Sequence, residues 1–160
     1  MKPDANGWLP PHQANCLGCG PDNDAGLRMR MRAEGRRARA QLVLDRRHEG
    51  APGFAHGGAV ATALDDLFGG VLVILGRPAV TARLAIDYRA PALLDRTLDL
   101  VAWCEGAEGR KLDLRGTIHD GPTLIAEAEA LFMTVDIAHF AKSGIPLPRT
   151  WHGWGTRTNA

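Results

Sequence analysis

The sequence has little cysteine, little net charge and no apolar run at its start, and each shortage excludes a class of protein. Three of its 160 residues are cysteines, too few for a disulfide framework. The formal net charge of +1 implies no general preference for nucleic acid or for an anionic membrane. The opening MKPDANGWLPPHQ has no apolar stretch of the kind found in signal peptides. We therefore expect one domain in the reducing cytoplasm, with neither nucleic acid nor membrane as a partner.

The sequence does have one long apolar run, HGGAVATALDDLFGGVLVIL, at residues 56–75. A segment that is apolar on nearly all sides predicts a buried helix, here over Gly58–Leu75 and about 27 Å long at roughly 1.5 Å per residue. A membrane span is a poor alternative, because an aspartate in mid-membrane costs about 2.5–3.5 kcal/mol on insertion scales and the run holds two. The rest of the chain is therefore predicted to wrap this helix.

Two neighbouring carboxylates, Asp65 and Asp66, stand in this apolar run. A buried charge without a partner is costly, so their presence needs a reason. The first amides of a helix can hold an oxyanion, and Gly57 and Gly58 let another group approach them closely. Asp65 lies about two turns beyond Gly58, on the same side. We take Asp65 as the candidate reactive carboxylate and Asp66 as a cap, an ion-pair partner or an interface residue. Alternatively, both face water or pair with arginine.

Alternation of polar and apolar residues predicts strands on both sides of the helix. The predicted ranges are 27–33, 37–45, 80–90, 97–105, 110–119 and 124–136. In the last range Ala126, Ala128 and Ala130 share one face and leave room for a bulky neighbour. The pattern predicts an α+β fold with an antiparallel sheet curled around one long buried helix. Such a sheet has edges, and pairing of the 80–90 strand with a second copy removes one of them. We therefore expect at least a dimer.

The segments outside the 25–137 domain are expected to be an irregular lead-in, residues 1–24, and a tail, residues 138–160. In the lead-in His12, Cys16 and Cys19 offer three zinc ligands. A structural zinc has four, and no second CxxC or paired histidine lies nearby. We therefore expect no metal, and interpret the CxxC as a tight turn that packs two soft side chains against the domain. Trp151 and Trp154 in the tail either stay flexible or dock on a subunit surface.

Four stretches resemble the hotdog-fold acyl-CoA thioesterases, in particular the group of the phenylacetate-pathway thioesterase. They are CLGCGPDNDAGLRM, HGGAVATALDD, VTARLAIDYRAP and LIAEAEALFMTV, in the order and at spacings compatible with that family. The most specific part is HGG, followed by an aspartate nine residues after the histidine and a threonine sixteen residues later. Here these positions are His56, Gly57, Gly58, Asp65 and Thr81. The resemblance implies a hotdog fold, a sheet wrapped around one helix, in agreement with the pattern above.

The resemblance also implies a mechanism. The thioester carbonyl would be polarised by the backbone amide of Gly58 or Gly57, while Asp65 of the partner subunit acts as general base or nucleophile. His56 would orient the substrate or the turn, and Thr81 would form a hydrogen bond near the attacking water or the carboxylate. The resemblance further implies an acyl-CoA substrate, no cofactor beyond the coenzyme A of that substrate, and a homodimer that pairs into a homotetramer.

Five other residues are candidates for substrate binding. Phe54, Leu67 and Phe68 are expected to help build the acyl pocket where two subunits meet. Arg83 and Arg89 are candidates for binding the coenzyme A phosphates, because arginine holds phosphate in a bidentate fork. Two rival functions stay open. One is a hotdog dehydratase acting on hydroxyacyl thioesters, against which the HGG-to-aspartate spacing argues; the other is a non-catalytic acyl-CoA-binding protein.

Overall fold

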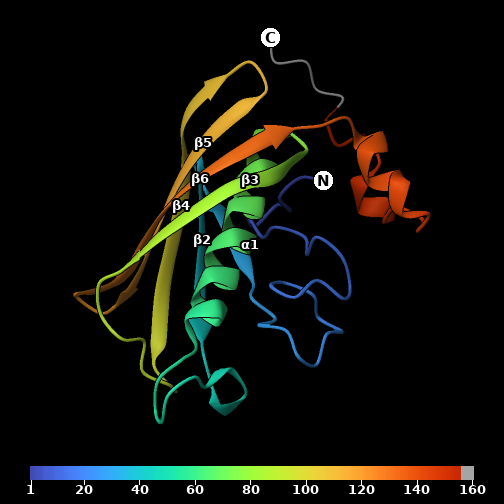
Figure 1. Ribbon diagram of the computed structural model, residues 1–160. Helices are drawn as coiled ribbons and strands as arrows, with labels where there is room; N and C mark the ends of the chain where they lie inside the picture. The colour runs from blue at the N-terminus through green and yellow to red at the C-terminus, as the bar shows by residue number, and fades with distance from the viewer. Residues whose placement is uncertain (156–160) are drawn as a thin grey trace.

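The chain forms one antiparallel sheet that curls around a single long helix (Figure 1). The structure is a computed structural model, and it describes residues 1–155. The six strands lie in the order β1-β2-β4-β5-β6-β3. The elements are β1 (Met31–Glu34), β2 (Arg37–Val43), α1 (Gly57–Leu75), β3 (Ala79–Tyr88), β4 (Thr97–Glu108), β5 (Lys111–Asp120) and β6 (Thr123–Thr134). The predicted α+β architecture is therefore confirmed.

Helix α1 begins and ends where the sequence supplies caps. At its start His56 has extended backbone, with φ −64° and ψ 134°, and its side chain accepts the amide hydrogen of Gly58. At its end Gly76 adopts a left-handed φ of 67°, a conformation that favours glycine at this cap. The helix is long and apolar enough to cross a membrane, with a mean hydropathy of 1.8, yet 56% of that stretch is buried inside the fold. It is the core helix of this domain.

The inner face of the sheet is shaped to receive a large side chain of α1. In β6, Ala126 and Ala128 are buried, as predicted. A Cβ on Gly116 of β5, which pairs with Ala128, would lie only 3.1 Å from the Phe68 ring. Phe68 also packs edge-on against Phe132, with ring centroids 6.0 Å apart. Small residues on two neighbouring strands thus make the space that this aromatic side chain fills.

Strand β1 is shorter than predicted. Alternation predicted a strand over 27–33, whereas the structure has Met31–Glu34. Arg28 has a positive φ of 51°, which breaks the extended conformation. The amides of Leu27 and Met29 donate to carbonyls of the lead-in loop at 2.8 and 2.9 Å. The backbone ahead of Met31 therefore pairs with the lead-in instead of with β2.

The lead-in and the tail both pack against the rest of the chain. In Figure 1 the lead-in, drawn in blue, lies on the side of α1 that faces away from the sheet. The tail carries two short 3-10 helices, Ile137–Ser143 and Arg149–Trp151. Its Trp151 donates a 2.6 Å indole hydrogen bond to the carbonyl of His12, and Trp154 is buried. The tail indoles therefore dock within their own chain; residues 156–160 of that tail lie outside the described part.

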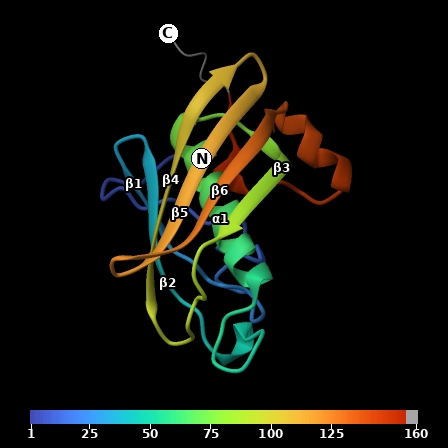
Figure 2. The same ribbon diagram turned by 60° about the vertical axis from the view of Figure 1, so that its left-hand side comes forward.

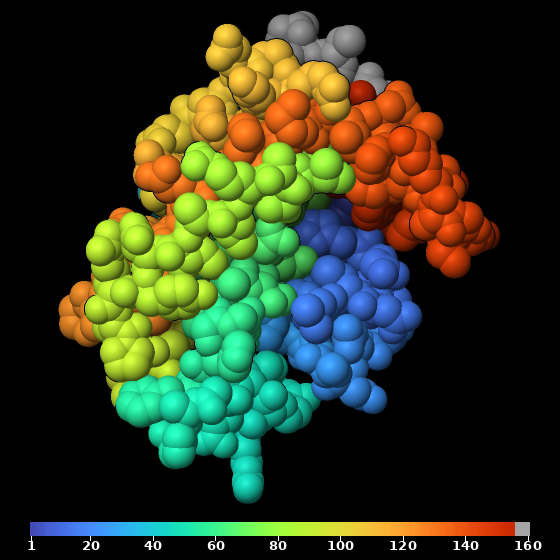
Figure 3. Space-filling model, in the orientation of Figure 1, coloured from blue at the N-terminus to red at the C-terminus, as the bar shows by residue number. Residues whose placement is uncertain are grey.

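Two surfaces of the core stay open in the single chain. Strand β3 is an edge of the sheet (Figure 2), and most of its residues from Thr81 onward are exposed. Figure 3 shows a strip of α1, in green, between β3 and the blue lead-in. The helix is thus covered by the sheet on one side and by the lead-in on another, but not along this strip beside β3.

Candidate active site

The first turn of α1 presents backbone groups at the surface. His56, Gly57 and Gly58 are all exposed. Nδ1 of His56 accepts the Gly58 amide hydrogen at 2.8 Å, so the imidazole acts as the N-cap side chain. The carbonyl of His56 meanwhile accepts from the amide of Ala59 at 2.9 Å. Of the two amides predicted to hold an oxyanion, that of Gly58 is therefore already engaged.

The Gly57 amide is the one left available. Within residues 1–155 it donates to no acceptor. The carbonyl of the same residue accepts a 2.8 Å hydrogen bond from the hydroxyl of Tyr88, which ties the end of β3 to the first turn of α1. Sequence reasoning missed Tyr88, although it is the only tyrosine in the chain and lies near the end of a predicted strand.

An open hollow of about 390 Å³ adjoins Gly57. Its lining is formed by Ala55, Gly57, Val60, Tyr88, Arg89, Ala90, Pro91, Ala92 and Ile125. Most of these side chains are small and apolar, with a single phenol and a single guanidinium. The hollow therefore suits an apolar group that ends close to a backbone N–H donor.

Asp65 lies further along the helix, beside the edge strand. The hydroxyl of Thr81 donates a 2.8 Å hydrogen bond to its Oδ1, so the structure brings together the aspartate and the threonine that the sequence singled out. Burial raises the pKa of the Asp65 carboxyl above its ordinary value, while the Thr81 hydrogen bond acts in the opposite direction. A carboxylate with a raised pKa and a fixed orientation is suited to taking a proton.

Asp65 and Gly57 do not meet within one chain. They are eight residues apart on one helix, which separates them by about 12 Å along the axis at roughly 1.5 Å per residue. A reacting carbonyl must lie within about 3–3.5 Å of an attacking atom and about 3 Å from its oxyanion donor. One chain therefore supplies two separate half-sites.

Asp66 faces another direction, toward the lead-in. Its Oδ1 lies 3.0 Å from Nδ1 of His12, and its side chain is 9% exposed. Of the three roles predicted for Asp66, the structure shows the ion-pair partner. Burial alone would lower the pKa of His12, but its bonds to Asp66 and Cys16 raise the pKa to about 10.

The residues predicted to line the acyl pocket lie in different environments. Leu67 and Phe68 are fully buried, and Phe68 packs on the sheet as described above. In this chain they form core and present no surface to a ligand, which corrects their predicted role. Phe54, by contrast, is 38% exposed and forms an isolated bridge with Leu93, which is 44% exposed. These two side chains form an apolar surface close to the start of α1.

The two candidate arginines also differ. Arg89 is ion-paired with Glu127 at 2.7 Å and with Asp87 at 3.2 Å. Its guanidinium is therefore already paired with acidic groups. Arg83 is exposed on β3 and has no ion-pair partner within residues 1–155. Arg83 is therefore the better placed of the two to meet an anionic ligand.

The fold identifies a class of protein. A protein called RHA08564, a thioesterase superfamily protein of known crystal structure, superposes on 75% of this chain and 60% of its own with a TM-score of 0.72 and 26% sequence identity. The structure of smu.793 from Streptococcus mutans, determined with acetyl CoA bound, superposes on 67% of this chain and 88% of its own with a TM-score of 0.63 at 23% identity. The chain therefore has the hotdog fold, as the resemblance implied.

Sequence comparison points to particular relatives. Residues 52–127, just under half of the chain, match the Thioesterase superfamily. The acyl-coenzyme A thioesterase THEM4 of Mus musculus is 41% identical over 90 residues, which are 55% of this chain and 39% of the mouse protein. The chain thus spans about two fifths of the length of this relative. The match to residues 52–127 includes the first turn of α1, Asp65 and Thr81.

Proposed function

We propose that this protein hydrolyses acyl-CoA thioesters as a homodimer, with the Gly57 amide of one subunit and Asp65 of the partner subunit acting on the same carbonyl. The observation that carries the proposal is the part-buried Asp65 carboxylate, held by Thr81 of the edge strand β3. A water-activating base belongs in such a position, at a surface that a second subunit would close.

The geometry of the chain supports the dimer. Within residues 1–155, strand β3 pairs with β6 on one side only, and its other side is an open edge where a second copy could pair. Consider a two-fold axis beside the middle of β3 and perpendicular to the strand. It would join the two sheets edge to edge. It would also place the open strips of the two α1 helices side by side, with the helices running in opposite directions. Antiparallel helices bring the first turn of one close to the middle of the other. Gly57 of one subunit then lies close to Asp65 of the partner subunit, although the two residues are roughly 12 Å apart along the helix of one chain.

The reaction then follows from these groups. Asp65 of the partner subunit takes a proton from water, and the oxygen of that water bonds to the thioester carbonyl carbon. The carbonyl oxygen gains the negative charge and accepts the Gly57 amide hydrogen. The carbon–sulfur bond then breaks, and the proton passes to the leaving thiolate, which gives a carboxylic acid and coenzyme A. A direct attack by Asp65 on the carbonyl uses the same arrangement and is the alternative route.

The remaining residues of the first turn position this donor. His56 fixes the turn through its bond to the Gly58 amide, which keeps the Gly57 N–H directed outward. Tyr88 holds the Gly57 carbonyl and so anchors the same residue through its other backbone group. In this proposal the hollow beside Gly57 receives the acyl group, Phe54 extends its apolar wall, and Arg83 meets a phosphate of coenzyme A. Pairing of dimers into a tetramer is a further part of the proposal.

The names of related proteins support the same substrate class. The mouse relative is an acyl-coenzyme A thioesterase, and the Streptococcus mutans structure contains acetyl CoA. Both the resemblance and the site geometry therefore favour a coenzyme A thioester. The acyl group itself is proposed only as small to medium in size, aliphatic or aryl, because the hollow beside Gly57 is open in the single chain.

The test is thiol release from a panel of acyl-CoAs, followed with a thiol-reactive dye. We expect the parent protein to release thiol and Asp65→Asn to lose at least about a hundredfold in rate, the range of general-base catalysis. Asp113→Asn is the matched control, because Asp113 is an exposed carboxylate on β5. Binding of acyl-CoA without thiol release would favour the non-catalytic binder, and formation of an enoyl product from a hydroxyacyl-CoA would favour the dehydratase.

A further inference from the structure

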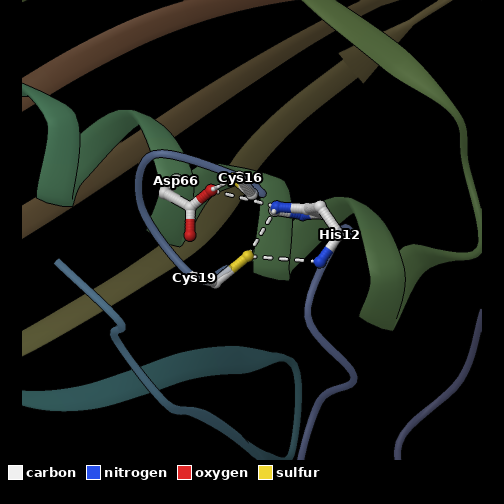
Figure 4. Close-up of side chains that lie close together, drawn as sticks. All are labelled: His12, Cys16, Cys19 and Asp66. Carbon is white, nitrogen blue, oxygen red and sulfur yellow. Dashed lines mark hydrogen bonds and ion pairs between the residues drawn. The ribbon is translucent and has the colours of Figure 1, made fainter. Parts of the chain in front are cut away.

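A second cluster of reactive side chains lies on the other side of α1, away from Asp65. Figure 4 shows His12, Cys16 and Cys19 of the lead-in converging on Asp66 of the helix. One potential ligand atom from each residue lies within 4.8 Å of all the others. Asp66 Oδ1 is 3.0 Å from His12 Nδ1 and 3.2 Å from the Cys16 sulfur. The Cys19 sulfur lies 3.3 Å from His12 Nδ1.

Two glycines make room for this cluster. A Cβ on Gly18 would lie 2.2 Å from the carboxyl carbon of Asp66, and a Cβ on Gly69 would lie 2.4 Å from Cε1 of His12. Any larger residue at either position would push a cluster side chain away. The chain therefore brings the CxxC loop and the helix closer together than ordinary side chains allow.

One atom of the cluster lacks a partner. Oδ2 of Asp66 is buried and accepts no hydrogen bond from the described residues. A buried carboxylate oxygen without a donor is costly. A cation bound by Oδ1 at the centre of the cluster would neutralise this carboxylate and so lower the cost of leaving Oδ2 without a donor.

We propose that these four side chains bind one zinc ion. Zinc bonds of about 2.3 Å to sulfur and about 2.0–2.2 Å to nitrogen and oxygen place neighbouring ligands of a tetrahedron roughly 3.3–3.8 Å apart. The separations of 3.0, 3.2 and 3.3 Å in the cluster lie close to that range. Two thiolates with one imidazole and one carboxylate suit zinc better than the harder magnesium or calcium.

The fourth ligand is what the sequence did not reveal. Three ligands from the lead-in are too few for a structural site, and Asp66 lies 50 residues beyond Cys16. Folding of the lead-in against α1 brings it into place. With four protein ligands the ion keeps no open position, so its role is structural.

Further contacts hold the ligands in position. The His12 amide donates to the Cys19 sulfur at 3.1 Å, and the Trp151 indole donates to the His12 carbonyl. Outer hydrogen bonds of this kind orient metal ligands. Zinc would thus fasten the lead-in, and through it the tail, to the central helix.

The experiment measures metal in the full chain. The protein is expressed with added zinc, purified with a reductant by gel filtration, and analysed by mass spectrometry of its metals. We expect about one zinc per chain, as one four-ligand site requires. In Cys16→Ser and Asp66→Asn, zinc affinity should fall more than the roughly 10–100-fold that loss of an outer partner costs. Cys104→Ser is the matched control, because Cys104 lies on β4 outside the cluster, and it should keep its zinc.

A second measurement does not depend on the variants folding. Cobalt added to the metal-free parent protein should give the absorption of a tetrahedral cobalt–thiolate centre, and zinc should abolish it. Reduced parent protein that binds neither metal would overturn the proposal. So would full zinc affinity in folded Asp66→Asn, or a Cys16–Cys19 disulfide that persists in the reductant used. None of these readouts depends on thioester hydrolysis.

Discussion

The hydroxyl of Thr81 donates a 2.8 Å hydrogen bond to Oδ1 of Asp65 and so joins the edge strand to the middle of the central helix. The two residues are sixteen apart in sequence. This bond holds the carboxylate at the open strip of α1. It also opposes the effect of burial on the carboxyl pKa, so Thr81 affects both the position and the proton affinity of Asp65.

The first prediction concerns pH. Burial raises the pKa of Asp65 and the Thr81 bond lowers it. Because only the deprotonated carboxylate acts as a base, the rate falls as the pH drops through this pKa. Thr81→Val removes the lowering contribution, so the acid limb of the kcat/KM profile should move to higher pH. Thr97→Val on β4 is the control and should leave the limb in place. If Thr81→Val left the acid limb unchanged, the limb would report the pKa of a group other than Asp65.

The second prediction isolates one backbone amide. Gly57→Pro removes the N–H of Gly57 at the first helical position, where proline is well tolerated. The preceding His56 has a ψ of 134°, which also suits a residue before proline. We expect kcat to fall about 10²–10³-fold, as for loss of one oxyanion donor. Gly57→Ala keeps the amide, and its Cβ would meet the Tyr88 hydroxyl at an ordinary 3.4 Å, so it should retain most activity. Equal losses in the two variants would argue against the Gly57 amide as donor.

Much of the fold follows from local pattern. Helix α1 was predicted to within a residue because its apolar run is bounded by a capping His56 and a left-handed Gly76. The strands β2, β4, β5 and β6 followed from alternation, since one face of each is largely buried. Strand β1 was the exception, because pairing of residues before Met31 with the lead-in is a contact between distant segments that alternation does not report.

The site was less predictable than the fold. The spacing from His56 singled out Asp65 and Thr81, which are joined by a hydrogen bond in the structure. A helix apolar on all sides, however, does not reveal which face meets the sheet. Phe68 was therefore assigned to a pocket although it lies in the core. The approach of Asp66 to the lead-in likewise depends on how distant segments pack.

The third prediction tests that correction. Phe68 is fully buried and contacts the ring of Phe132, so Phe68→Ala should lower the free energy of unfolding by about 3–5 kcal/mol. Phe54→Ala removes a ring that is 38% exposed and should cost much less. Urea unfolding of both variants measures the difference. Similar stabilities for the two would place Phe68 outside the core.

The last prediction asks whether one active site is built from two chains. A Gly57→Pro chain still carries Asp65, and an Asp65→Asn chain still carries the Gly57 amide. Each variant alone should be nearly inactive, whereas a mixed dimer has one intact site in which the two good halves meet. Random pairing makes about half of the dimers mixed, each with one of its two sites intact, so co-expression should restore about a quarter of the parent activity. Mixing the same Gly57→Pro chain with one that carries both substitutions is the control, because no intact site can form there. If both groups acted within one chain, the first mixture would stay as inactive as the control, and the shared site would be excluded.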